Sequence, residues 1–79
     1  MCEIDIIAKF KNRTVFIEVK TRRTNSFGTP MEAITRTKYN NIKTGVLSYL
    51  QENKIKNYQI DAIGITLDPE LKIEHLKNI

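Results

Sequence analysis

Residues that could cross-link a small domain are scarce in this sequence. Its one cysteine, Cys2, excludes an internal disulfide, and its one histidine, His75, is expected to have a surface or packing role. No apolar run approaches the roughly 20 residues of a membrane span, and the first residues lack the apolar core of a signal peptide. We therefore expect a cytoplasmic protein without a membrane segment.

The length of 79 residues allows one domain, residues 1–79, with a small core. A chain of this size buries about 60 to 65% of the surface that its unfolded form exposes. Domains below about 80 residues often need a disulfide, a metal or a partner subunit to be stable. Since a disulfide is excluded, a metal or oligomerisation remains.

Positive charge is concentrated in one segment of the chain. The net charge is +4, but residues 20–43 alone carry +5 and the rest carries −1. The basic residues of this segment are Lys20, Arg22, Arg23, Arg36, Lys38 and Lys43. Such a block suits a polyanion, above all nucleic acid, and a solvated basic face is the alternative. We expect Arg22, Arg23, Arg36 and Lys38 to contact phosphates, which positions a nucleic acid without reading its sequence.

Two runs with period-two alternation predict a β-hairpin. The runs cover residues 3–10 and 14–21, with a short polar loop between them. If Phe10 pairs with Arg13 across a two-residue loop, Asp5 lies opposite Glu18 on the neighbouring strand. A three-residue loop without a bulge would break this register.

The rest of the chain predicts one helix and two further strands. Thr35 is a plausible cap for an amphipathic helix over residues 36–53, and residues 58–66 and 71–76 resemble strands. The predicted order is strand, strand, helix, strand, strand, which makes an α/β domain. The apolar stripe of the helix consists of Tyr39, Ile42, Val46, Tyr49 and Leu50, so the tyrosines are expected in the core.

The predicted hairpin places ionisable groups together on one face. Asp5 and Glu18 repel each other across the strands, so a cation is expected between them. Mg²⁺ suits this position because it prefers hard oxygen ligands and is often held by one or two carboxylates together with phosphate oxygens. Lys20 shares the face, where it could orient a water or stabilise charge that develops on a phosphodiester. These three residues are the predicted catalytic site, with Asp5 and Glu18 as ligands of Mg²⁺ or Mn²⁺.

A purely structural interpretation of the same residues stays open. Glu18 and Lys20 could lie on a solvent-facing sheet, with Lys20 paired to Glu3 for roughly 0.2 to 1 kcal/mol. The apolar residues that flank them favour instead a sheet covered on both sides, where ionisable groups are costly unless they are used. That context favours the catalytic interpretation.

The sequence also resembles the YraN-type endonuclease family. The resemblance lies in the segments CEIDIIA, VFIEVKTR, FGTPMEAI with Lys38, QIDAIGI and IEHLKNI, and it covers nearly the whole chain. That family belongs to the restriction-endonuclease-like superfamily, whose signature is an acid on one strand followed by D/E-x-K on the next. The resemblance implies a mixed sheet with a flanking helix and a metal-dependent endonuclease acting on DNA. It assigns Asp5, Glu18 and Lys20 to the motif positions.

The chain departs from the family pattern at its beginning. Family members usually start with a helix and a strand, and that helix typically supplies a further acid to the metal site. Without these elements, one face and one edge of the sheet would be uncovered, so a homodimer is expected. Two functions therefore stay open: a metal-dependent endonuclease, and a non-catalytic module of the same fold that binds nucleic acid or dimerises.

Overall fold

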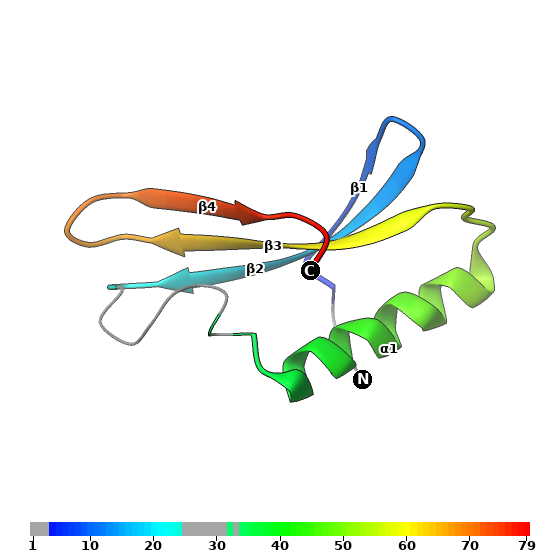
Figure 1. Ribbon diagram of the computed structural model, residues 1–79, viewed down its shortest axis with the longest axis horizontal. Coiled ribbons are helices and arrows are strands. Elements are labelled where there is room, and N and C mark those ends of the chain that lie inside the picture. The colour runs from blue at the N-terminus through cyan, green and yellow to red at the C-terminus, as the bar shows by residue number, and fades with distance from the viewer. Residues whose placement is uncertain (1–3, 25–31, 33) are drawn as a thin grey trace.

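The computed structural model describes residues 4–24, 32 and 34–79, so the prediction made for Glu3 lies outside the described residues. The strands are β1 (Ile6–Phe10), β2 (Arg13–Arg22), β3 (Tyr58–Thr66) and β4 (Lys72–Leu76), and the helix is α1 (Arg36–Glu52) (Figure 1). The predicted order of strand, strand, helix, strand, strand is confirmed, with bounds that differ by at most a few residues.

The four strands form one mixed sheet in the order β1-β2-β3-β4. The β1–β2 and β3–β4 pairs are antiparallel, whereas β2 and β3 are parallel. Parallel neighbours need a crossover connection, and α1 lies in that connection. Figure 1 shows α1 running along one face of the sheet, with the β1–β2 hairpin rising steeply on the other side. Strands β1 and β4 form the two edges of the sheet.

The hairpin has the predicted register. Phe10 pairs with Arg13 and Ile6 pairs with Ile17, so the loop consists of Lys11 and Asn12. The antiparallel register continues toward Asp5 and Glu18, which brings the two predicted metal ligands to neighbouring positions.

The core attaches α1 to the two central strands. Phe16 is fully buried and forms a cluster with Ile42 and Val46 of α1 and with Ile60 of β3. The Phe16 ring meets the Tyr49 ring edge-on at a centroid distance of 5.5 Å. Tyr39 and Tyr49 both pack against this cluster, which confirms their predicted place in the core.

Helix α1 begins at the predicted cap. The Thr35 hydroxyl accepts a hydrogen bond from the backbone nitrogen of Lys38 at 3.2 Å, which satisfies a donor that the helix itself leaves free. At the other end, the backbone of Asn53 is extended (φ −131°, ψ 131°), so the helix ends at Glu52, one residue earlier than predicted. The backbone N–H of Asn53 still donates to the Tyr49 carbonyl. Within the described ranges, no helix has the length and apolar character needed to cross a membrane.

The sheet face opposite α1 carries exposed apolar side chains. Ile6 is 44% exposed, Phe10 65% and Ile73 63%, and no helix of the described residues covers them. The expectation of a sheet covered on both sides is therefore wrong for the described part of the chain, because its one helix lies on the Phe16 face. Self-association through the uncovered face stays a prediction.

A buried carboxylate joins β3 to the C-terminal segment. Asp61 is 2% exposed, and it accepts hydrogen bonds from Gln59 Nε2 at 2.8 Å and from the backbone nitrogen of Asn78 at 2.9 Å. Its other oxygen lies 2.7 Å from His75 Nε2. Burial opposes ionisation, but these hydrogen bonds outweigh it and lower the pKa of Asp61. Asp61 and His75 thus have a structural role, which agrees with the expectation for His75.

Candidate active site

Three side chains of β2 alternate on the sheet face that α1 covers: Phe16, Glu18 and Lys20. Phe16 lies under the helix, whereas Glu18 and Lys20 lie farther along the strand. Their neighbours on β3 are Ala62 and Gly64, which share this face because residues paired in a parallel register point the same way. These small neighbours leave Glu18 and Lys20 room above the sheet.

Asp5 is fixed at the end of the hairpin by a backbone contact. It lies just before β1, and its Oδ2 atom accepts a hydrogen bond from the backbone nitrogen of Val19 at 2.8 Å. Since Val19 follows Glu18 directly, this bond holds the Asp5 carboxylate beside the Glu18 side chain. The predicted proximity of the two acids is confirmed.

The Asp5 carboxylate disturbs the ionisation of Glu18. Burial raises the pKa of Glu18, and a hydrogen bond with Asp5 and repulsion by its charge raise it further. A hydrogen bond between two carboxyl groups needs a proton on one of them, so Glu18 tends to retain its proton. The charges of Lys20 and Lys38 act in the opposite direction on the Glu18 pKa, but they do not cancel the increase.

Lys38 belongs to the same cluster although it comes from another element. It lies in the first turn of α1, and its hydrogen-bonding contact with Lys20 lowers the pKa of Lys38. Desolvation and the charges of Lys20 and Arg22 act in the same direction, whereas Glu18 opposes them. Two acids and two lysines therefore form one cluster, made of the segment before β1, strand β2 and the start of α1.

The charges in the first turn of α1 do not favour helix stability. It contains Arg36 and Lys38 and no acidic residue. Cations at a helix N-terminus oppose the helix dipole, typically at a cost of about 0.3 to 1 kcal/mol each. The placement of Lys38 is therefore better explained by its neighbours in the cluster than by the helix.

The structure separates the four predicted phosphate contacts. Arg22 ends β2 on the same face as Lys20, and its charge affects Lys38. Arg23 is exposed, and its carbonyl accepts a hydrogen bond from the backbone nitrogen of Asp68 at 2.8 Å. Arg36 is exposed on the helix. Of the four, Lys38 is the residue that lies beside the acids, a position that sequence spacing alone did not reveal.

The donor set of this cluster fits a hard divalent cation. Asp5 and Glu18 provide carboxylate oxygens at adjacent positions, and their mutual repulsion is the feature that a cation would relieve. Among the described residues no third acid, histidine or cysteine joins them, so the further acid that the family resemblance implies is not found there. Two carboxylates suffice for Mg²⁺ when phosphate oxygens and waters complete its coordination.

Comparison with known proteins gives relatives along most of the chain. Residues 1–65 match the model of a family described as "Uncharacterised protein family UPF0102". A UPF0102 protein of Caldicellulosiruptor saccharolyticus is 43% identical over 81 residues, which cover 96% of this chain and 69% of the relative. UPF0102 protein TTE1452 of Caldanaerobacter subterraneus is 40% identical over 96% of this chain and 67% of the relative. A UPF0102 protein of Nocardia farcinica is 38% identical over 98% of this chain and 64% of the relative.

Proposed function

The chain belongs to the UPF0102 family, which confirms the YraN-type resemblance, and we propose that it is a metal-dependent endonuclease that hydrolyses phosphodiester bonds of DNA. The observation that carries the proposal is the cluster of Asp5, Glu18, Lys20 and Lys38. Opposed carboxylates next to lysines on one sheet face match the acid and D/E-x-K arrangement of the restriction-endonuclease-like fold. The mixed four-stranded sheet with a crossover helix supports that fold.

In this proposal, Asp5 and Glu18 hold Mg²⁺ or Mn²⁺. The bound cation supplies charge neutralisation at the phosphate and lowers the pKa of a coordinated water. The chain's own contribution is to keep both carboxylates together through the Val19 N–H and to orient them over small neighbours on β3. Because Glu18 holds its proton more strongly than an ordinary glutamate, metal and protons compete for this pair.

The two lysines have complementary roles in the proposed hydrolysis. The oxygen of water bonds to phosphorus, the ester bond to the departing oxygen breaks, water loses a proton and the departing oxygen gains one. Lys20, as an ammonium, stabilises negative charge on the phosphate. Lys38 loses its proton more readily than an ordinary lysine, which suits it to accept the proton of the attacking water.

A cleavage assay tests the proposal. Branched, single-stranded and duplex DNA are incubated with the purified chain and Mg²⁺ or Mn²⁺, and the products are separated by electrophoresis. We expect metal-dependent products with the wild type and their loss in Glu18→Gln and Lys20→Met. The controls Glu70→Gln and Lys72→Met change the same residue types at exposed positions around β4. Wild-type inactivity on every substrate, or equal activity of the Glu18 and Lys20 variants, would refute the assignment.

The second candidate is a nucleic-acid-binding module without catalysis. One observation favours it: Asp5 already has a structural role, because its carboxylate accepts the hydrogen bond of the Val19 N–H at the end of the hairpin. A structural role of this kind requires no metal and no catalysis. This alternative predicts nucleic acid binding that weakens with salt, with no turnover in any metal. Binding by a wild type that never cleaves would support it.

A further inference from the structure

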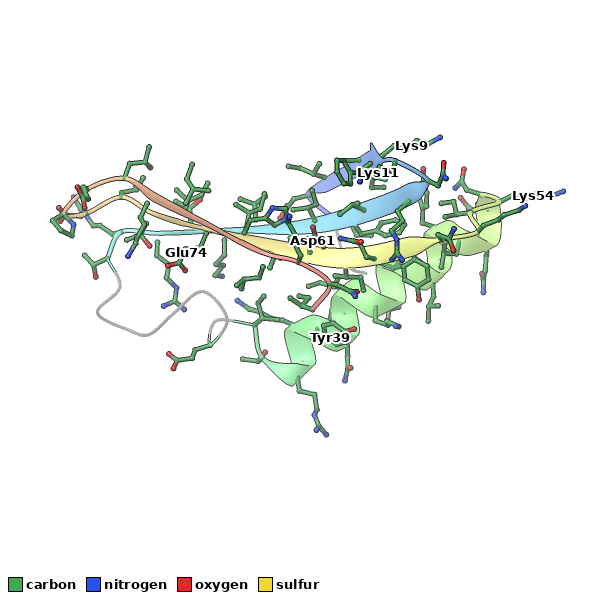
Figure 2. All side chains as sticks on the ribbon, turned by 45° about the horizontal axis from the view of Figure 1, so that its top comes forward. Lys9, Lys11, Tyr39, Lys54, Asp61 and Glu74 are labelled. Atoms are coloured by element: carbon green, nitrogen blue, oxygen red, sulfur yellow. The ribbon has the colours of Figure 1, made fainter. Side chains whose placement is uncertain are left out.

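A second cluster of cations lies at the loop end of the β1–β2 hairpin, whereas Asp5 of the candidate active site lies at its open end. The cluster lines a groove of about 880 Å³ between the β1–β2 hairpin, the end of α1 and the loop that leads to β3. We call this surface the basic groove, and its cations are Lys9, Lys11, Arg13, Lys54 and Lys56. None of its lining residues is an aspartate or glutamate. Figure 2 shows Lys9 and Lys54 extending outward at the same end of the molecule, with Lys11 near them on the hairpin.

The five cations of the basic groove are exposed and lack acidic partners. Within the described residues no carboxylate forms an ion pair with any of them. The Lys11 side chain lies over an aromatic ring, with its Nζ 5.4 Å from the centroid of Phe10. A run of lysines on one helix is commonly a solvated face, but these side chains converge from segments about 40 residues apart. Like charges gathered without counter-charges create a positive potential that attracts an anionic ligand.

The positive φ angle of Lys11 indicates that its side chain has a function. Lys11 has a φ of 56° in the two-residue hairpin loop, in the left-handed region that favours glycine or asparagine. A lysine there costs the fold about 1 kcal/mol relative to glycine. A lysine is not needed to form the turn, because glycine would form it more easily. The lysine instead places an additional cation at the rim of the basic groove.

One cation of the basic groove, Lys9, lies on the same sheet face as the candidate active site. Ile7 pairs with Phe16, so Ile7 lies on the α1 face. Lys9 and Asp5 are each two residues from Ile7 and therefore point to the same face. Four residue steps along the chain lead from Asp5 to Lys9, a span of about 13 Å when the chain is extended. This span corresponds to about four base-pair steps along the axis of a B-form duplex, at about 3.4 Å each. A nucleic acid strand that follows edge strand β1 would therefore meet both sites.

We propose that the basic groove binds the sugar-phosphate backbone of a nucleic acid strand whose neighbouring nucleotides reach the carboxylate cluster. Binding of the backbone in the groove does not require catalysis. Only the delivery of neighbouring nucleotides to the carboxylate cluster rests on the proposed function. Asn12, Asn53 and Asn57 also line the groove and provide amide donors for phosphate oxygens. Contacts of this kind fix position on the strand and carry no sequence preference.

The test measures binding separately from cleavage. A fluorescently labelled oligonucleotide, single-stranded or as a duplex of the same sequence, is titrated with the chain in EDTA at several KCl concentrations. The variant Lys9→Gln/Lys54→Gln removes two charges of the basic groove. The control Lys72→Glu changes the net charge by the same amount near the opposite end of β3, because Lys72 pairs with Thr66. A second variant, Lys11→Gly, removes a charge while relieving backbone strain.

We expect weaker binding by the double variant and a slope of log affinity against log salt that is smaller by about 1.4 to 1.8. Lys11→Gly is expected to bind more weakly and to unfold at a higher temperature, which separates lost binding from lost folding. Lys72→Glu is expected to bind nearly as the wild type does. An unchanged slope in the double variant, or equal weakening by Lys72→Glu, would overturn the proposal.

The outcomes also separate this proposal from others. A wild type that cleaves DNA while the groove variants bind normally would refute the basic groove alone. A wild type that never cleaves, with groove variants that bind weakly, would refute the nuclease alone.

In a parallel arm, the chain is mixed with vesicles that contain phosphatidylserine. Vesicle binding that the groove variants lose, with unchanged oligonucleotide binding, would assign the groove to an anionic membrane surface instead.

Discussion

The Asp5 carboxylate accepts a hydrogen bond at 2.8 Å from the backbone nitrogen of Val19, the residue that follows Glu18. This bond connects the beginning of the hairpin to its second strand and holds two acidic side chains together. Their repulsion is a cost to the fold, and the pKa of Glu18 rises in consequence of burial and of this neighbour. A functional site commonly has such a cost, because groups placed for binding are not placed for stability.

Replacing Glu18 by glutamine should therefore stabilise the fold. In the folded chain Glu18 retains its proton above the ordinary glutamate pKa of 4.5, so its stabilising effect is present at low pH and is lost as the pH rises. Glu18→Gln stays neutral, and we expect a gain of roughly 0.2 to 1 kcal/mol in the free energy of unfolding at neutral pH. The gain should vanish below about pH 4. Urea unfolding at several pH values measures it, with Glu70→Gln as control, and a loss of stability at neutral pH would contradict the account.

Removing Lys38 should make Glu18 retain its proton to a higher pH. The charge of Lys38 lowers the pKa of Glu18, so in Lys38→Met that pKa rises further. The pH at which Mn²⁺ binding is half lost should then move upward, because the metal needs the ionised carboxylate. Arg36→Met removes a charge from the same helical turn and should leave this pH unchanged. Identical pH profiles for wild type and Lys38→Met would show that Lys38 is not part of the cluster.

Asp61→Asn should destabilise the fold without affecting the candidate site. The hydrogen bonds from Asn78, Gln59 and His75 keep the pKa of Asp61 below its ordinary value of 3.8. Its stabilising effect is thus present above pH 3.8 and is lost as the pH falls through the lower folded value. We expect a loss of about 1.5 to 3 kcal/mol at neutral pH, because hydrogen bonds to a charged acceptor are replaced. Chemical unfolding beside exposed Asp68→Asn checks it, and equal stability of the two variants would argue against the network.

Phe16→Ala should destabilise the fold strongly. The side chain is fully buried, and its ring lies edge-on to Tyr49 and Tyr58. Such a truncation typically costs 3 to 5 kcal/mol, while a domain of this size has about 4 to 12 kcal/mol in total. Urea unfolding followed by circular dichroism should show a midpoint far below that of the wild type. Phe10→Ala, at the 65% exposed end of β1, is the matched control and should keep its structure.

Local patterns in the sequence were sufficient to predict the hairpin and the acid pair. Alternation with period two fixed the faces of β2, and a two-residue loop fixed the register that brings Asp5 to Glu18. The helix was equally predictable, because its apolar stripe recurs every three or four residues and Thr35 caps it.

Features that depend on packing between distant segments were not predictable. The position of Lys38 depends on the direction in which α1 crosses the sheet, and no local pattern gives that direction. The pairing of Asp61 with His75 depends on the register of β3 with β4. The basic groove was missed for a similar reason: charge counted along the chain favours residues 20–43, whereas Lys9 and Lys54 meet only in the fold.

The most direct test of the central claim is a calorimetric titration of Mn²⁺ into the purified chain at neutral pH. The account predicts one saturable site in the wild type and in Glu70→Gln, and loss of that site in both Asp5→Asn and Glu18→Gln. Binding should also weaken on acidification at a higher pH than an ordinary glutamate would require, because the pKa of Glu18 is raised. No saturable binding by the wild type, or unchanged binding in both site variants, would contradict the claim that Asp5 and Glu18 form a metal site.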